Sequence, residues 1–147
     1  THNHPEGIKG AVIIAVCTHL LINGFDKDDI LNYACKYYSD EDILSPILTL
    51  DEYEKRRKRI STTYSVTCMH TVPLAIRCFY ESNNYEDCIT KAIMNSMDAD
   101  TCAAIAGCLA SVYYKKFNTN TINAWNNYKK DIIDIVKNYT DCNITML

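Results

Sequence analysis

The stretch from Cys102 to Val112 is apolar on nearly every side, and it constrains the fold more than any other part of the chain. A helix that is apolar all round belongs in the middle of a domain, because each of its faces needs a covering neighbour. Glycine and proline are scarce, with 4 and 3 copies in 147 residues, although sandwiches and barrels use both in their turns. We therefore expect an all-α fold built around a buried helix.

Oxygen-bearing side chains stand directly before and at the start of this helix. Asp98, Asp100 and Thr101 place two carboxylates and a hydroxyl within four residues. Mg²⁺ and Ca²⁺ prefer such ligands, and a packed helix would hold them in place. Asp and Thr are also ordinary residues at helix starts, where they suit the free N–H groups and the helix dipole. From these residues alone, a metal site and a helix cap both stay open.

Two histidines stand just before the first expected helix, which Pro5 suits as its first residue and Asn23-Gly24 suits as its end. His2 and His4 form a His-x-His pair, which is compatible with zinc. Zinc sites need a third protein ligand, however, and no further Cys or His lies nearby in the sequence. Exposed or capping histidines are the alternative.

Hydrophobic periodicity and capping residues predict further helices, separated by polar linkers at 39–46 and 118–121. The expected helices span residues 27–38, 49–59, 73–81, 85–95 and 122–139. Their expected inward residues are Ile30, Leu31, Ala34 and Tyr37 or Tyr38, then Cys88, Ile89, Ala92 and Ile93, and finally Trp125, Ile132, Ile133 and Val136.

Charge and cysteine usage narrow the class of protein. The formal charge is −3, and the basic run at 55–59 has no interleaved aromatic residues, so a solvated helix face is expected and nucleic acid is not. The eight cysteines are scattered singly through apolar stretches, so we expect free thiols in a cytoplasmic protein. No signal peptide is recognisable, and the longest apolar run, at 11–17, is too short to span a membrane.

Three stretches together resemble the ADP-ribosylglycohydrolase family. They are Thr-His-Asn-His-Pro-Glu-Gly-Ile-Lys-Gly-Ala at 1–11, Cys-Met-His-Thr-Val-Pro-Leu-Ala-Ile at 68–76, and Asp-Ala-Asp-Thr-Cys-Ala-Ala-Ile-Ala-Gly at 98–107. The Tyr-Glu-Asp-Cys-Ile stretch at 85–89 is similar to a Phe-Glu-Asp-Ala-Ile segment of the same family. The resemblance implies an orthogonal multi-helix bundle, of which residues 1–147 form the C-terminal part and an N-terminal half is missing.

The resemblance also implies a site. Two Mg²⁺ (or Mn²⁺) ions are expected, with Asp98, Asp100 and Thr101 as half of their ligands and the other half in the N-terminal region. The catalytically important Glu of the family lies in that region too, so no catalytic residue is assigned in this chain. His2 is expected to contact the substrate, because the corresponding segment lies along the ADP-ribose side of the cleft in relatives.

The implied function is Mg²⁺-dependent release of ADP-ribose from a modified protein or small molecule. One departure matters, since relatives carry Gly-Gly before the first Asp and this chain has Ser96-Met97. A non-catalytic ADP-ribose-binding or structural, crystallin-like member of the family is therefore the alternative. We also expect an apolar surface that the missing half covers, because the few helices here cannot bury it all. It comprises Val12, Ile14, Ala15, Ala104 and Cys108.

Overall fold

The computed structural model of the protein describes residues 3–44, 47, 49–52 and 67–144, and all regular elements in these ranges are helical. The all-α prediction is thus confirmed. In chain order the helices are α1 (Pro5–Ile22), α2 (Lys27–Ala34), α3 (Asp40–Ile43), α5 (Cys68–Tyr80), α6 (Tyr85–Asn95), α7 (Ala99–Tyr114) and α8 (Thr119–Ile144). The chain divides into two compact units, Thr1–Lys116 and Phe117–Leu147.

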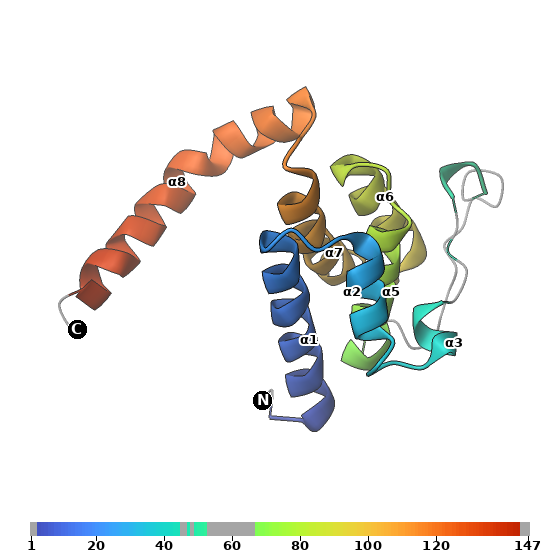
Figure 1. Ribbon diagram of the computed structural model, residues 1–147. Coiled ribbons are helices and arrows are strands. Elements are labelled where there is room, and N and C mark those ends of the chain that lie inside the picture. The colour runs from blue at the N-terminus through green and yellow to red at the C-terminus, as the bar shows by residue number, and fades with distance from the viewer. Residues whose placement is uncertain (1–2, 45–46, 48, 53–66, 145–147) are drawn as a thin grey trace. The chain divides into compact units, whose positions relative to one another are not determined.

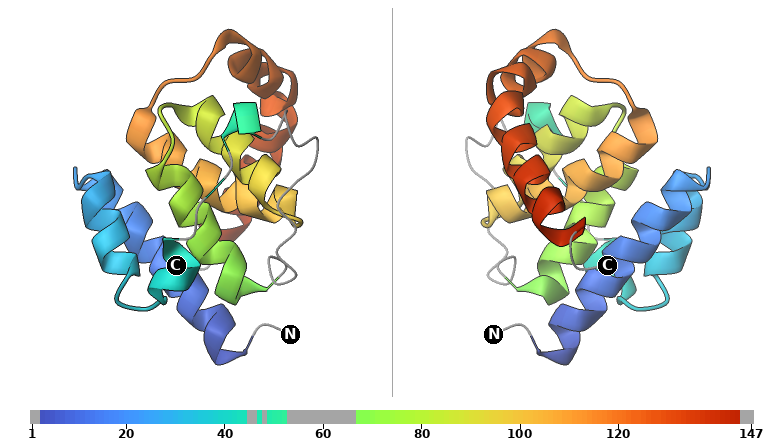
Figure 2. Two further views of the ribbon diagram at one scale, coloured as in Figure 1. Left: turned by 90° about the vertical axis from the view of Figure 1, so that its right-hand side faces the viewer. Right: turned by 90° about the vertical axis from the view of Figure 1, so that its left-hand side faces the viewer.

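Helix α5 is the centre of the first unit. It contacts α1, α2, α3, α6 and α7, and the views in Figure 1 and Figure 2 show it in the middle of these helices. Most of its side chains are buried as a result: Thr71, Val72, Pro73, Ala75, Ile76, Cys78 and Phe79. Removing that much apolar surface from water is the main force that holds the unit together.

The start of α5 differs from the prediction, which placed it at Pro73. The helix begins five residues earlier, at Cys68, with Thr67 as its N-cap, so Pro73 lies inside the helix. Proline lacks the N–H that would bond to the carbonyl one turn back, here that of Met69. Burial of Val72 and Ile76 on either side of the proline outweighs that missing bond.

Both ends of α1 follow the prediction. The Nδ1 atom of His4 accepts the N–H of Glu6 at 3.2 Å, and Pro5 is the first helical residue. Asn23 caps the other end, and Gly24 then adopts a positive φ of 88°, which favours glycine. His4 is therefore a capping residue, as the plainer of its two interpretations expected.

Helix α2 begins as predicted but ends early. Asp26 and Asp29 form a capping box at its start, whereas the helix stops at Ala34 instead of continuing to residue 38. Tyr38 is still buried at 7% exposure, together with Ile30 and Ala34. The inward face was thus predicted correctly, although its last turn is not helical.

The predicted linker at 39–46 contains the short helix α3. Ser39 starts it, because its hydroxyl accepts the N–H of Asp42 at 3.2 Å. Ile43 is fully buried and ties this turn to the core. Four helical residues give too short a period to recognise in a polar stretch.

A capping box of Thr49 and Glu52 begins the helix expected over 49–59. The Thr49 hydroxyl accepts the N–H of Glu52 at 3.3 Å, and the Glu52 carboxylate accepts the N–H of Thr49 at 2.9 Å. The rest of the helix predicted over 49–59, with its basic run, lies outside the described residues.

Helix α8 forms the second unit and is longer than predicted at both ends. It starts at Thr119 because the Asn118 side chain accepts the N–H of Thr121 at 2.8 Å, and it ends at Ile144. Trp125 and Ile132 are 50% and 40% exposed. Ile133 is half-buried, and the Val136 side chain lies outside the described residues. The inward orientation of this face concerns contacts beyond the second unit and stays a prediction.

Two general features complete the description. The seven cysteines whose side chains are described are all free thiols, as predicted; Cys142 is outside that set. Helix α1, with 18 residues and a mean hydropathy of 1.5, has the length and composition of a membrane span, as many core helices also do.

A candidate metal site at the start of α7

A short linker between α6 and α7 leads into the candidate site. Asn95 and Ser96 are buried at 3% and 0% exposure, and the Asn95 amide donates to the carbonyl of Lys91 at 2.9 Å. The linker is therefore fixed from the α6 side. Met97 follows and is 52% exposed, so its side chain stands out from this fixed backbone directly before Asp98.

Close packing of α6 on α7 fixes the linker from the other side. Cys102 and Ala106, on the first turns of α7, are fully buried. At Gly107 an added Cβ would lie 2.8 Å from Cδ1 of Ile89 on α6, so the absence of a side chain lets the two helices approach. The start of α7 thus stands on a rigid support.

The structure brings the two predicted carboxylates together. Asp98 occupies the N-cap position of α7 and is half-buried, while Asp100 and Thr101 in the first turn are exposed. A hydrogen bond from the Asp98 side chain, followed by those from the backbone N–H groups of Thr101 and Asp100, lowers the pKa of Asp100. Two neighbouring carboxyl groups repel each other once both are ionised. A cation between them would relieve that repulsion.

The helix-cap interpretation fits only in part. The Asp98 side chain makes no capping hydrogen bond, although its residue holds the N-cap position. Asp26 and Asn84 cap α2 and α6 through their side chains in the ordinary way. The Asp98 carboxyl instead faces Asp100.

The donors at this site suit a hard divalent cation but do not complete its coordination. Two carboxylates and the Thr101 hydroxyl are oxygen ligands of the kind that Mg²⁺ takes. Octahedral Mg²⁺ needs six ligands, and in the described part of the chain no three His, Cys, Asp or Glu side chains gather around one point. The residues present therefore form part of a site. His2, the predicted substrate contact, lies outside the described residues.

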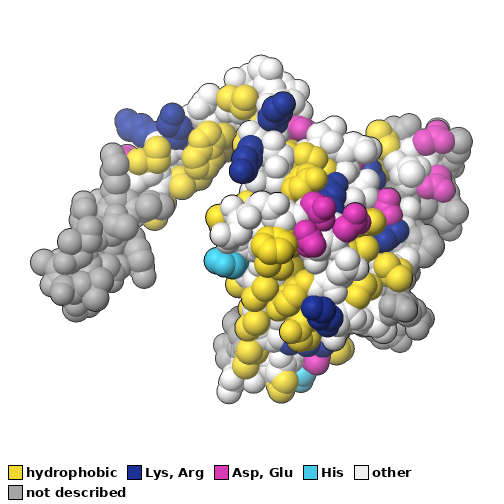
Figure 3. Space-filling model, in the orientation of Figure 1, with side chains coloured by type: hydrophobic (Ala, Val, Ile, Leu, Met, Phe, Trp, Pro, Cys, Tyr) yellow, Lys and Arg dark blue, Asp and Glu magenta, His cyan; other side chains and the backbone are white. Residues whose placement is uncertain are grey.

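An apolar face starts next to this cluster. Ala104 and Cys108 are exposed on α7, and Val12 and Ala15 are exposed on α1, while Ile14 is half-buried. The Thr18 hydroxyl lies 3.9 Å from Sγ of Cys108, so the exposed stripes of α1 and α7 are neighbours. Hydrophobic side chains gather along α1 in the space-filling view of Figure 3. The α1–α7 face thus comprises Val12, Ala15, Ala104 and Cys108, four of the five residues predicted for an open apolar surface, whereas Ile14 packs against the core.

One polar cluster of the first unit was missed from the sequence. It joins Lys27 of α2 to Ser82 and Tyr114, which are 55 and 87 residues further along the chain. The only local signal is a lysine at the first position of a helix, where a positive charge opposes the helix dipole.

Comparison with known proteins places the chain in a family. The model of the ADP-ribosylglycohydrolase family matches residues 1–138. The chain is also 32% identical over 114 residues to a protein of Pseudomonas putida (strain GB-1) named ADP-ribosylarginine hydrolase Tri1. That alignment covers 78% of this chain but 30% of the relative, so the chain spans about a third of the length of that protein. No solved structure matches.

The chain belongs to the ADP-ribosylglycohydrolase family. The family match covers α1 to α7 and most of α8, and it includes the stretch with Asp98, Asp100 and Thr101. The resemblance inferred from the sequence is thereby confirmed. The family is one of hydrolases that act on ADP-ribose linkages.

Proposed function

We propose that this chain supplies part of the metal site of a Mg²⁺-dependent ADP-ribosyl glycohydrolase. The observation that carries the proposal is the placement of Asp98 at the N-cap of α7 and of Asp100 in its first turn, on a helix whose Cys102 is fully buried. Family membership makes such a pair of oxygen ligands meaningful, whereas an isolated Asp-x-Asp-Thr sequence would be an ordinary helix start.

In this proposal, Asp98, Asp100 and Thr101 hold two Mg²⁺ (or Mn²⁺) ions together with ligands from the rest of the domain. Bound divalent ions would supply charge that orients ribose hydroxyls and stabilises an activated water during cleavage of the glycosidic bond. The three side chains keep their positions because Cys102 and Ala106, on the next turns of α7, are buried without exposure.

The proposed substrate is ADP-ribose attached to a protein side chain or to a small molecule. The name of the Pseudomonas relative favours arginine as the attachment point. An enzyme of this kind would meet its modified targets in the cytoplasm, where free thiols such as those described here are stable.

The site is proposed to be completed by an N-terminal half of the domain. Val12 and Ala104, on the α1–α7 face, are exposed although both are apolar, and Asp100 precedes Ala104 by about one turn of α7. A partner segment packed there would bury the face and bring further ligands to Asp98 and Asp100. Residues 1–147 alone are therefore expected to be inactive and to bind Mg²⁺ weakly.

The test uses the longest protein product that contains residues 1–147, incubated with an ADP-ribosylated arginine peptide. We expect ADP-ribose release with Mg²⁺ and none with EDTA. Asp100→Ala should abolish release while leaving the helix content of the circular dichroism spectrum unchanged.

The matched control is Asp29→Ala, which removes a first-turn carboxylate of α2 that acts only in a capping box. Loss of a cap costs about 1 kcal/mol of stability and leaves catalysis alone. If Asp100→Ala behaves like Asp29→Ala, the Asp98–Asp100 pair is a helix start and the proposal is wrong.

A non-catalytic ADP-ribose-binding or crystallin-like role is the second candidate, and Met97 favours it. Its 52% exposed side chain stands directly before Asp98, where the family resemblance leads one to expect a glycine. Calorimetric binding of ADP-ribose without release from any ADP-ribosylated substrate would support this role. Recovery of release in Met97→Gly would identify the methionine as the cause.

A further inference from the structure

Lys27, the first residue of α2, directs its ammonium group into a set of oxygen acceptors from distant parts of the chain. Its Nζ atom donates to the carbonyls of Tyr80 and Ser82 at 3.2 and 2.5 Å. It also donates to the Tyr114 hydroxyl at 2.7 Å. A lysine ammonium has three protons, and these three oxygens provide one acceptor for each. The Ser82 hydroxyl, at 3.5 Å from Nζ, is a fourth and more distant oxygen.

Aromatic rings enclose the same atom. Nζ lies 5.2 Å from the ring centroid of Phe79, 5.5 Å from that of Tyr113 and 5.0 Å from that of Tyr114. Each distance is within the range of a cation–π interaction. The ammonium of Lys27 thus contacts three aromatic rings as well as the three oxygens.

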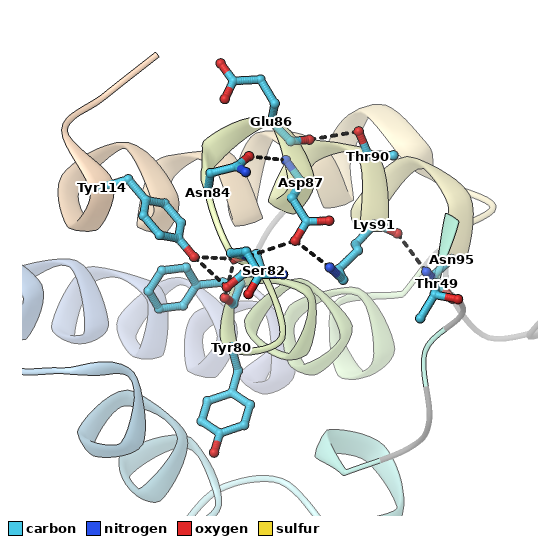
Figure 4. A network of polar contacts seen from close by, with 12 residues as sticks. Thr49, Tyr80, Ser82, Asn84, Glu86, Asp87, Thr90, Lys91, Asn95 and Tyr114 are labelled. Atoms are coloured by element: carbon cyan, nitrogen blue, oxygen red, sulfur yellow. Dashed lines mark hydrogen bonds and ion pairs between the residues drawn. The ribbon is translucent and has the colours of Figure 1, made fainter. Parts of the chain in front are cut away.

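The acceptors are held in place by bonds of their own. The Ser82 hydroxyl donates to the carbonyl of Phe79 at 2.6 Å. The Tyr114 hydroxyl donates to the carbonyl of Ser82 at 2.6 Å, which leaves its lone pairs for Lys27. Figure 4 shows Ser82 and Tyr114 pointing toward each other, with Tyr80 on the same corner between α5 and α6. The oxygens and rings around Nζ, called the cage below, are therefore held in place by hydrogen bonds that do not involve Lys27.

The position of Lys27 is costly by itself. A cation at the first residue of α2 opposes the dipole of that helix, and burial lowers the pKa of Lys27 because the ammonium loses water. The carbonyls that receive it belong to Tyr80, the last residue of α5, and to Ser82 just beyond it, where a helix favours positive charge. The ammonium charge is therefore unfavourable at the start of α2 but favourable at the end of α5, and the two effects oppose each other.

We propose that the oxygens and rings around Lys27 form a binding site for a primary ammonium ion, which the chain fills with its own lysine. The occupied site acts as a clasp that holds the start of α2 on the α5–α6 corner and on the last turn of α7. An open pocket of about 440 Å³ borders the site and gives access to it from solvent. Its lining residues are Asp26, Lys27, Asp28, Tyr80, Glu81, Ser82, Asn83 and Tyr113.

The experiment empties the site and refills it. In Lys27→Ala the missing atoms correspond to propylammonium, so this ion is the probe. We expect Lys27→Ala to lower the midpoint of thermal unfolding by about 5 °C or more. Propylammonium chloride at millimolar concentrations should restore at least half of that shift. Propylguanidinium and 1-propanol should not, because one is planar and the other is uncharged.

The matched control is Lys36→Ala. Lys36 follows α2, and its ammonium lies 5.9 Å from a single ring, that of Tyr33. This variant should change the midpoint by about 1 °C or less and show no response to propylammonium. Equal midpoints for Lys27→Ala and Lys36→Ala would overturn the clasp. Equal restoration by propylammonium and 1-propanol would overturn the ammonium site.

A measurement on the unaltered chain covers the case in which Lys27→Ala does not fold. Ammonium protons that are held in hydrogen bonds exchange more slowly with water and become visible in ¹⁵N-detected spectra. We expect a lysine ammonium signal with nuclear Overhauser contacts to the ring of Tyr114. If every lysine ammonium exchanges rapidly, the hydrogen bonds of Lys27 do not persist and the ammonium site does not exist.

Discussion

Helices α5 and α1 are both rich in apolar residues, yet their surroundings differ. In α5 the buried residues cover most of the circumference, because five other helices contact it. In α1 only Gly10, Ile13, Cys17 and Leu21 are buried, and Ile8, Val12 and Ile22 are 48%, 52% and 65% exposed. Composition therefore indicates how much of a helix needs cover, while its neighbours decide how much cover it receives.

The difference between the two helices also separates stability from assembly. Residues of α5 contribute to the folding of the first unit itself. The outward residues of α1 contribute little to it and are available for whatever packs on the α1–α7 face. Substitutions on the two helices should therefore give different readouts.

The largest effect is expected at Phe79, a fully buried residue of α5. Phe79→Ala should lower the free energy of unfolding by about 3–5 kcal/mol, because it removes an aromatic side chain and leaves a cavity. Urea unfolding followed by circular dichroism measures this loss. A loss below about 1 kcal/mol would show that α5 is not the centre of the core.

The next largest effect on stability is expected at Ile13 of α1, in comparison with its neighbour Val12. Ile13 is 1% exposed and Val12 is 52% exposed. Ile13→Ala should cost about 2–4 kcal/mol, whereas Val12→Ala should change stability by less than about 0.5 kcal/mol. The same urea experiment applies to both variants. A large cost for Val12→Ala would mean that another part of the chain already covers the outer face of α1.

Thiol reactivity distinguishes the buried and open faces without a mutation. Cys108 is exposed, and it should react first with a disulfide reagent such as Ellman's reagent. Cys17 and Cys88 should react only on unfolding, because burial raises the pKa of each to about 11 and excludes the reagent. The hydrogen bond to Cys102, followed by burial, likewise raises the pKa of Cys78.

Mass spectrometry after timed alkylation would identify the order of reaction. Early modification of Cys78 would contradict the enclosed position of α5. A mass two hydrogens lower per bridge under non-reducing conditions would contradict the prediction of free thiols.

The smallest effect concerns the acid titration of the candidate metal site. Asp98→Ala removes the hydrogen bond that contributes most to the lowered pKa of Asp100, so that pKa should rise toward its ordinary value. A lowered folded-state pKa gives stability that is present above the unfolded-state pKa and is lost as the pH falls through the folded-state value. The variant should therefore lose this contribution at a higher pH.

Carboxyl ¹³C NMR titration of Asp100 in both proteins measures this shift. An unchanged midpoint would mean that the two carboxyl groups are not in contact. Addition of MgCl₂ should lower the midpoint further in the unaltered chain and less in Asp98→Ala, since the pair shares the cation.

The parts of the fold that were predictable depend on local signals. His4 and Asp26 mark helix starts through side chains that accept an N–H of the next turn, and Pro5 marks one through its fixed φ. Sequence spacing alone identifies such residues. Pro73 misled the prediction, because a proline rule at helix starts cannot weigh the tertiary burial that keeps this one inside α5. The exposed Trp125 shows the converse, since its pattern indicates a buried face but not what covers it.

The candidate site was predictable for a related reason. Asp98 and Asp100 are two residues apart, so their closeness follows from the local chain, and the family resemblance indicated their chemistry. The cage around Lys27 was not predictable, because its partners Ser82 and Tyr114 come from α5–α6 and α7 and meet only in the packed unit. The metal ligands proposed to come from an N-terminal half could not be predicted from residues 1–147.

The backbone conformation at the end of α7 determines where this helix opens transiently. Lys115 closes it with a left-handed φ of 54°, a conformation that costs a residue with a Cβ atom about 1 kcal/mol. The opposite end stands on buried Cys102 and Ala106. Transient opening of α7 should therefore begin at Lys115, and the hydrogen bond from Tyr114 to the Ser82 carbonyl should stop it at the next residue. Amide exchange should thus be fast at Lys115 while the carboxylate pair keeps its geometry.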